Sequence, residues 1–190
     1  KPFKPKSWEN TPREWLSTID IENVLKQYEN KHKDFHFIGC VPIDFDYELY
    51  PGNCVVNELC KLNINNFFNK QKTKIGIVFN LDKHNESGSH WVALFCNFDK
   101  KEICYFDSYG MPEPNEVTKL IQRFKNQGKE RGLDMKVKIN DIRHQYKNSE
   151  CGVYCITFII KLLENESFER FCKRKIPDDT IFKNRELFFI

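Results

Sequence analysis

The chain has 190 residues, of which 30 are basic and 27 acidic, so its net charge of +3 is close to balance. This balance gives no argument for nucleic-acid binding, and a content of 40% hydrophobic and 14% aromatic residues excludes a disordered chain. No apolar run approaches the roughly 20 residues that a membrane span needs. The length suits one domain with a sizeable core.

The eight cysteines are dispersed along the chain, and most of them lie within apolar runs, as buried free thiols do. No two have CxxC spacing, so we expect neither a structural zinc site nor any other metal or cofactor. The chain begins without a methionine and without an apolar signal segment, so we expect a fragment or a processed form that lacks an N-terminal extension. Without a secretory signal, a reducing compartment is expected and secretion is not.

The N-terminal part predicts an arm, a helix and a strand. Residues 1–13 are polar and contain three prolines, which favours an extended arm ahead of a single domain over residues 14–190. Asp20 is placed to cap a helix whose apolar side chains follow at helical spacing. The aromatic and branched residues 35–45 favour a strand. Residues 54–68 are ambiguous, although their apolar spacing suggests a helix.

Three strands are expected next, over residues 74–80, 90–98 and 102–107, the last two joined by a short hairpin connection. A helix beginning at Pro114 and ended by Gly128 and Gly132 should follow, then a strand over residues 133–140 with one wet face. Short terminal helices are predicted at residues 168–172 and 180–189. The chain is therefore predicted to be an α+β domain, a mostly antiparallel sheet packed against helices.

The chemistry centres on residues 148–155, where a polar loop enters an apolar run. Residues 153–163 are apolar almost without a break and predict a buried helix. The N-terminal end of a helix carries partial positive charge and free amide donors, which favour the thiolate of Cys151. Gln145, six residues earlier, has an amide that can donate to a developing oxyanion. Taken alone, a cysteine before an apolar helix is more often a core thiol.

A thiol nucleophile needs a base, usually histidine, and a group that orients the base. His90 begins an apolar strand directly after a polar loop, and Asp107 ends the strand predicted to pair with it. Antiparallel pairing brings the start of one strand beside the end of the next, so His90 and Asp107 should be neighbours. Taken alone, Asp107 is also typical of an ordinary turn.

The other four histidines are weaker candidates. His32 and His36 have the spacing of a metal pair, but no further ligands follow, and a solvated helix end is the simpler interpretation. His84 lies in the loop before His90. His144 could face either way along its strand.

Three segments carry a family resemblance: Gly88-Ser89-His90-Trp91-Val92-Ala93-Leu94, then Tyr105-Phe106-Asp107-Ser108, and then Gln145 with Cys151-Gly152-Val153-Tyr154. In this order they resemble the Ulp/SENP and adenain-type cysteine proteases of clan CE. The likeness covers about residue 15 to the end. It extends to the polyprotein protease of African swine fever virus and related proteases of large DNA viruses, through Phe79-Asn80-Leu81-Asp82, Ile142-Arg143-His144-Gln145 and the Phe-rich C-terminus. That viral protease has Asn where this chain has Asp107, so this triad is more similar to the Ulp form.

The resemblance implies a nucleophile at the N-terminus of a buried central helix, in the Ulp/adenain fold. Carried over by position, it makes Cys151 the nucleophile, His90 the general base and acid, and Asp107 the group that fixes the tautomer of His90. The Gln145 side chain, with the Cys151 backbone amide, would form the oxyanion hole.

The resemblance also implies a substrate slot. Trp91 and Trp15 would wall a narrow passage that admits Gly-Gly and rejects side chains, because only glycine lets a backbone pass between two aromatic faces. Asn80 would assist His90.

Three function classes are open. The first is an endopeptidase that cuts viral structural polyproteins after Gly-Gly during virion maturation. The second is a deubiquitinase or an isopeptidase on SUMO or another ubiquitin-like modifier. The third is an acyltransferase or an inactive ubiquitin-like-binding module, and the intact Cys, His, Asp and Gln set argues against inactivity.

The expected partner is a protein substrate with a Gly-Gly motif; we expect a monomer, no membrane and no nucleic-acid partner, and a DNA or peptide activator is left open. A viral enzyme would act in the virion and host cytoplasm, any other in the cytoplasm or nucleus.

Overall fold

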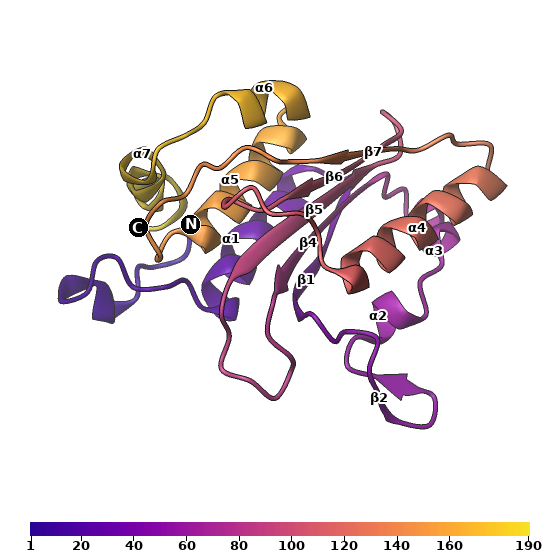
Figure 1. The fold of residues 1–190 in the computed structure, drawn as a ribbon, viewed down its shortest axis with the longest axis horizontal. Helices are drawn as coiled ribbons and strands as arrows, with labels where there is room; N and C mark the ends of the chain where they lie inside the picture. Colours follow the sequence, from indigo (N-terminus) through magenta and orange to yellow (C-terminus); the bar gives the residue numbers. More distant parts are fainter.

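A five-stranded sheet in the order β1-β4-β5-β6-β7 runs through the middle of the computed structural model, which describes all residues from 1 to 190 (Figure 1). The strands of this sheet are β1 (Phe35–Pro42), β4 (Lys74–Asn80), β5 (Trp91–Asn97), β6 (Glu102–Phe106) and β7 (Lys136–Ile139). The central pairings, β4 with β5 and β5 with β6, are antiparallel, whereas β1 with β4 and β6 with β7 are parallel. The prediction of a mostly antiparallel sheet does not extend to these outer pairings, because helical crossovers lead from β1 to β4 and from β6 to β7.

Helices cover both faces of the sheet (Figure 1). One face packs against α1 (Thr18–Lys31), α5 (Cys151–Leu163), α6 (Phe168–Lys173), α7 (Asp178–Lys183) and α8 (Arg185–Phe188). The other packs against α2 (Asn57–Cys60), α3 (Ile64–Asn69) and α4 (Asn115–Glu130). Every residue of β5 is buried, which explains why its sequence is a continuous apolar run rather than an alternating one. The α+β class with a sheet packed on helices is confirmed.

Several predicted boundaries differ from the observed ones. The N-cap of α1 is Ser17, and Asp20 is the third residue of a capping box in which each side chain accepts from the other's backbone amide. Helix α4 runs past Gly128, where a Cβ would lie 2.9 Å from Met135 Cγ, so glycine allows the close approach of the segment that leads into β7. The single C-terminal helix expected over residues 180–189 is divided into α7 and α8.

The ambiguous stretch between β1 and β4 is a set of short elements. A two-stranded hairpin of β2 (Glu48–Tyr50) and β3 (Asn53–Cys54) precedes α2 and α3. Cys54 and Cys60 form a disulfide, which nothing in their spacing predicts. Of the six free cysteines, five are buried and Cys40 is partly exposed, as expected for thiols in apolar runs. No helix is long and apolar enough to cross a membrane.

The first thirteen residues, predicted as an extended arm, lie against the C-terminus, and Figure 1 shows the two chain ends side by side. A 3₁₀ turn, Lys6–Glu9, buries Trp8, whose ring meets Phe189 edge-on at 4.9 Å between centroids. The amide of Lys4 donates to the carbonyl of Ile190 at 2.8 Å. The arm is therefore part of the packed structure, since its tryptophan belongs to the core.

Candidate active site

Cys151 is the first residue of α5, and it is 1% exposed. Every residue of this helix except Lys161 is buried, so its apolar sequence fixes it against the sheet. No side chain caps the N-terminus of α5, which leaves its first amide groups without a side-chain acceptor. A thiolate on Cys151 would therefore face the positive end of the helix dipole.

His90 and Asp107 are brought together by the pairing of β5 and β6. His90 precedes the first residue of β5 and Asp107 follows the last residue of β6, and the two strands are in antiparallel register. The His90 Nε2 atom lies 2.7 Å from Asp107 Oδ1, with both side chains nearly buried. The other ring nitrogen, Nδ1, is thus free to serve a second group.

The pKa of His90 is raised to about 9. Burial alone would lower it, but hydrogen bonding to Asp107 and the interaction with the Cys151 sulfur raise it by more than burial lowers it. The imidazole is therefore held in its charged form between a carboxylate and a thiol. A charged imidazole beside a thiol is one way in which a cysteine nucleophile is activated.

Tyr109 is a site residue that the sequence did not indicate. Its ring is stacked on His90, with centroids 4.5 Å apart and planes inclined by 20°. The negative face of an aromatic ring attracts a cation such as the charged imidazole. The only sequence signal is that Tyr109 comes two residues after Asp107, at the turn that follows β6.

Gln145 lies between β7 and α5, and its side chain is completely buried. Its Oε1 atom accepts a hydrogen bond from Ser108 Oγ at 2.6 Å, whereas its Nε2 atom has no partner. The backbone is also fixed, because the Gln145 amide donates to the Ser108 carbonyl at 2.8 Å. A buried amide nitrogen with no acceptor is costly in the resting protein and is suited to meet a charge that develops during a reaction.

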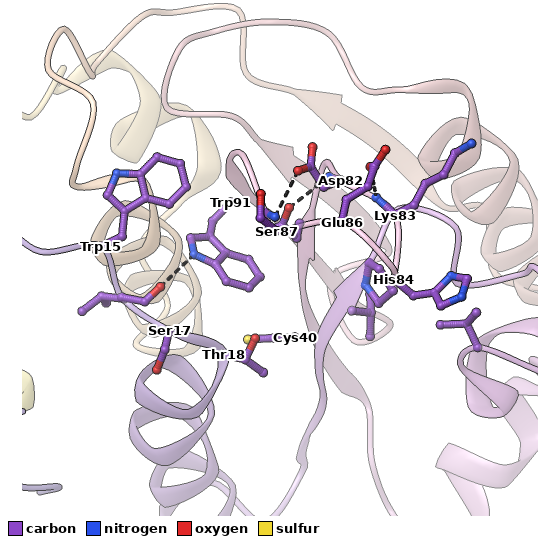
Figure 2. Close-up of a pocket in the computed structure, with 16 residues that line it drawn as sticks. Trp15, Ser17, Thr18, Cys40, Asp82, Lys83, His84, Glu86, Ser87 and Trp91 are labelled. Atoms are coloured by element: carbon purple, nitrogen blue, oxygen red, sulfur yellow. Dashed lines mark hydrogen bonds between the residues drawn. The ribbon is translucent and has the colours of Figure 1, made fainter.

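A cavity of about 560 Å³ lies between the segment that leads into α1 and the loop that joins β4 to β5 (Figure 2). Trp15, Trp91 and Asn80 line it, together with Gly88 and other residues of the loop before His90. Trp91 is fixed by a hydrogen bond from its Nε1 to the Leu16 carbonyl at 3.0 Å, and Trp15 is 38% exposed. The two tryptophans predicted as slot walls thus border one cavity.

Asn80 makes no hydrogen bond to His90. Its Oδ1 atom accepts from the amides of Asp82 at 3.0 Å and Ser89 at 3.2 Å, at the two ends of the loop that leads to His90. A Cβ on Gly88 would lie 3.0 Å from Asn80 Nδ2, so the loop closes tightly around this amide. Asn80 is therefore connected to His90 only through the backbone of this loop.

Three of the remaining histidines, His36, His84 and His144, have structural partners. His36 is on β1 and not at a helix end, between Glu29 and Glu58 carboxylates at 2.7 Å each. His84 Nδ1 contacts Asp44, and His144 Nδ1 accepts from the Ile176 amide at 3.1 Å. Burial lowers the pKa of His144, so it is a neutral core histidine.

Comparison with known proteins finds relatives of this chain. A protein of Acanthamoeba polyphaga mimivirus that carries the name thiol protease is 34% identical over 177 residues, which are 93% of this chain and 57% of that protein. A SUMO-1 cysteine protease of African swine fever virus is 28% identical over 185 residues, 92% of this chain and 67% of that protein. The chain thus spans little more than half of the mimivirus relative.

The fold is also that of solved proteases. The crystal structure of the African swine fever virus protease matches with a TM-score of 0.81 and 24% identity, over 100% of this chain and 71% of that one. The SUMO protease Ulp1 matches with a TM-score of 0.58 and 16% identity, over 91% of this chain and 78% of that one. Residues 56–185 match the family described as the Ulp1 protease family, C-terminal catalytic domain. The chain therefore belongs to the Ulp1 protease family of cysteine proteases.

Proposed function

We propose that this chain hydrolyses peptide bonds after Gly-Gly, with Cys151 as the nucleophile. The observation that supports this most is a buried thiol at the start of α5 beside an imidazole that a carboxylate holds at 2.7 Å. Nucleophile, base and orienting acid are the groups that thiol hydrolysis requires.

Each residue has a defined role in the proposed reaction. The Cys151 sulfur attacks the carbonyl carbon of the second glycine, and the oxyanion receives hydrogen bonds from Gln145 Nε2 and the Cys151 amide. His90 gives its proton to the leaving amine as the C–N bond breaks, which leaves a thioester. Water then attacks the thioester carbonyl and gives a proton to His90, and the C–S bond breaks to release the acid. Asp107 holds the His90 ring throughout.

The Gly-Gly preference is proposed from the cavity walls. Trp15 and Trp91 border one cavity, and Trp91 packs so closely on Gly152, the residue after Cys151, that a Cβ on Gly152 would lie 3.3 Å from Trp91 Cδ1. A passage between aromatic walls leaves little room for side chains on the substrate, whereas glycine has none.

We propose a viral structural polyprotein as the substrate, cut during virion maturation in the virion or host cytoplasm by a monomeric enzyme. The relatives named above are proteins of large DNA viruses, which supports a viral setting. No nucleic acid or membrane takes part in this proposal.

A ubiquitin-like modifier is the second candidate substrate, and one surface feature favours it. The hairpin of β2 and β3 exposes Tyr47, Leu49 and Tyr50, which are 58%, 50% and 61% exposed. The Tyr47 ring stacks on His84, with centroids 5.7 Å apart, and His84 lines the cavity. A folded body upstream of Gly-Gly could therefore rest on this hairpin.

A substrate panel tests these proposals. Fluorogenic Gly-Gly-Xaa peptides, matched Ala-Gly and Gly-Ala peptides, and ubiquitin and SUMO substrates are compared, with Cys151→Ala as the control. We expect Gly-Gly peptides to be cleaved and both alanine peptides to be resistant. Cleavage confined to the ubiquitin or SUMO substrates would favour the isopeptidase, and acetyl-CoA-dependent transfer would show an acyltransferase. A Gly-Gly vinyl-sulfone adduct on any thiol other than Cys151 would contradict the nucleophile assignment.

The pH profile should follow His90. Because its pKa is raised to about 9, the imidazolium that protonates the leaving amine persists to that pH, and kcat/KM should fall as the pH rises through about 9. Asp107→Asn removes one of the groups that raise this pKa, so the falling limb should move to lower pH. The measurement is kcat/KM for a Gly-Gly amide between about pH 6 and pH 10. If the falling limb stays at the same pH in Asp107→Asn, the titration that causes it does not belong to the His90–Asp107 pair.

A further inference from the structure

The turn after β6 reaches both halves of the proposed active site. Asp107 contacts the base, His90, at 2.7 Å, and the next residue, Ser108, donates its hydroxyl proton to Gln145 Oε1 at 2.6 Å. Ser108 is 1% exposed and Gln145 is fully buried, so no water competes for this bond. The Ser108 carbonyl also accepts from the amides of His144 and Gln145, both at 2.8 Å.

The two ends of a primary amide have nearly the same shape and opposite chemistry. If the Gln145 side chain turned over, its oxygen would take the place of the nitrogen and would repel a developing oxyanion. The Ser108 hydroxyl makes no other hydrogen bond, so the observed orientation is the one that gives its proton an acceptor. The orientation leaves Nε2 as the free end of the amide.

The backbone fixes where Gln145 lies, but it does not determine which end of the side-chain amide is the nitrogen. A Cβ on Gly110 would lie 2.9 Å from the backbone nitrogen of Arg143, so the turn after β6 packs directly against the segment that carries Gln145. These contacts fix the Gln145 backbone and leave the last side-chain torsion free. That torsion alone decides which end of the amide faces away from Ser108.

We propose that Ser108 is a positioning residue that sets the orientation of the Gln145 amide, so that its nitrogen serves as the oxyanion donor. This inference rests on the oxyanion role proposed above for Gln145. A preorganised donor stabilises the transition state without a reorganisation cost, whereas an amide that turns freely presents the nitrogen for only part of the time. Loss of Ser108 should therefore lower kcat and leave KM unchanged.

The test is a double-mutant cycle between Ser108→Ala and Gln145→Met, with Ser108→Thr as the conservative variant. Ser108→Ala should lower kcat for a Gly-Gly amide about 3- to 10-fold, the effect of one buried hydrogen bond, and Ser108→Thr should retain most of the rate. In the Gln145→Met background, Ser108→Ala should cause no further loss. Alkylation of Cys151 by iodoacetamide needs no oxyanion hole and should proceed at the wild-type rate in every variant.

Ser167→Ala is the matched control, because it removes a helix-capping serine hydroxyl at α6 and should leave kcat unchanged. Equal losses from Ser108→Ala in both backgrounds, or slower alkylation of Cys151, would overturn the proposal and point to a structural role. If Gln145→Met retains full kcat, the oxyanion role and this inference are both wrong. If Gln145→Met is impaired and Ser108→Ala is not, only this inference is wrong.

Discussion

Replacing Gln145 by alanine is expected to lower kcat by about 100- to 1000-fold, the usual effect of losing one oxyanion donor. The Gln145 Nε2 atom is buried and has no partner in the resting protein, so it is available to a charge that forms on the substrate. Its hydrogen bond is made only when that charge develops, and for this reason KM should change little. The measurement is steady-state hydrolysis of a Gly-Gly amide.

Two controls separate chemistry from folding in this variant. Gln145→Met keeps the volume of the side chain without the donor and should be impaired as severely as alanine. The lost bond from Ser108 costs stability by roughly 1 kcal/mol, so both variants should unfold cooperatively near the wild-type midpoint. If Gln145→Met were nearly as active as wild type, Gln145 would contribute to catalysis through its side-chain volume and not through a hydrogen bond.

Local patterns in the sequence predicted the central part of this site. His90 and Asp107 are 17 residues apart and joined by one hairpin, so antiparallel pairing was enough to bring them together. Cys151 stands at the change from polar loop to apolar run, which marks the start of α5. These inferences needed only strand pairing and helix periodicity.

Local sequence patterns do not predict contacts between segments that are distant in the chain. The bond from Ser108 to Gln145 joins residues 37 apart, and it depends on how the turn after β6 packs against the segment before α5. The parallel outer strands depend likewise on where the helical crossovers place β1 and β7. At the start of α1, Ser17 and Asp20 both have capping side chains, and only the backbone geometry shows that Ser17 is the N-cap.

The contact between Arg185 of α8 and Glu150, the residue before Cys151, also joins distant segments. Its loss is expected to have a large effect on stability. Glu150, which precedes Cys151, has a completely buried carboxylate, and Arg185 of α8 lies 3.0 Å from its Oε2 atom. Arg185 also donates to the Glu14 carbonyl at 2.7 Å and lies over the Trp8 ring at 4.6 Å. One guanidinium therefore ties the N-terminal arm and the C-terminus to the start of α5.

Arg185→Met should destabilise the protein by about 3–5 kcal/mol, because the buried Glu150 carboxylate loses its nearer cation and keeps only the Arg13 guanidinium, at 3.8 Å, and the Ser149 hydroxyl, at 3.2 Å. Urea unfolding followed by tryptophan fluorescence measures this change. Arg170→Met, at a side chain that is 79% exposed, is the matched control and should change stability by less than about 0.5 kcal/mol.

The double variant Glu150→Leu with Arg185→Met distinguishes an unpaired charge from lost packing. An apolar pair of similar volume often replaces a buried ion pair at little cost, so the double variant should be more stable than Arg185→Met alone. If the two are equally unstable, the arginine acts through its contacts with Trp8 and Glu14 and not through Glu150. Recovery of stability in the double variant, with kcat retained, would show that the ion pair secures the start of α5 without taking part in the reaction at Cys151.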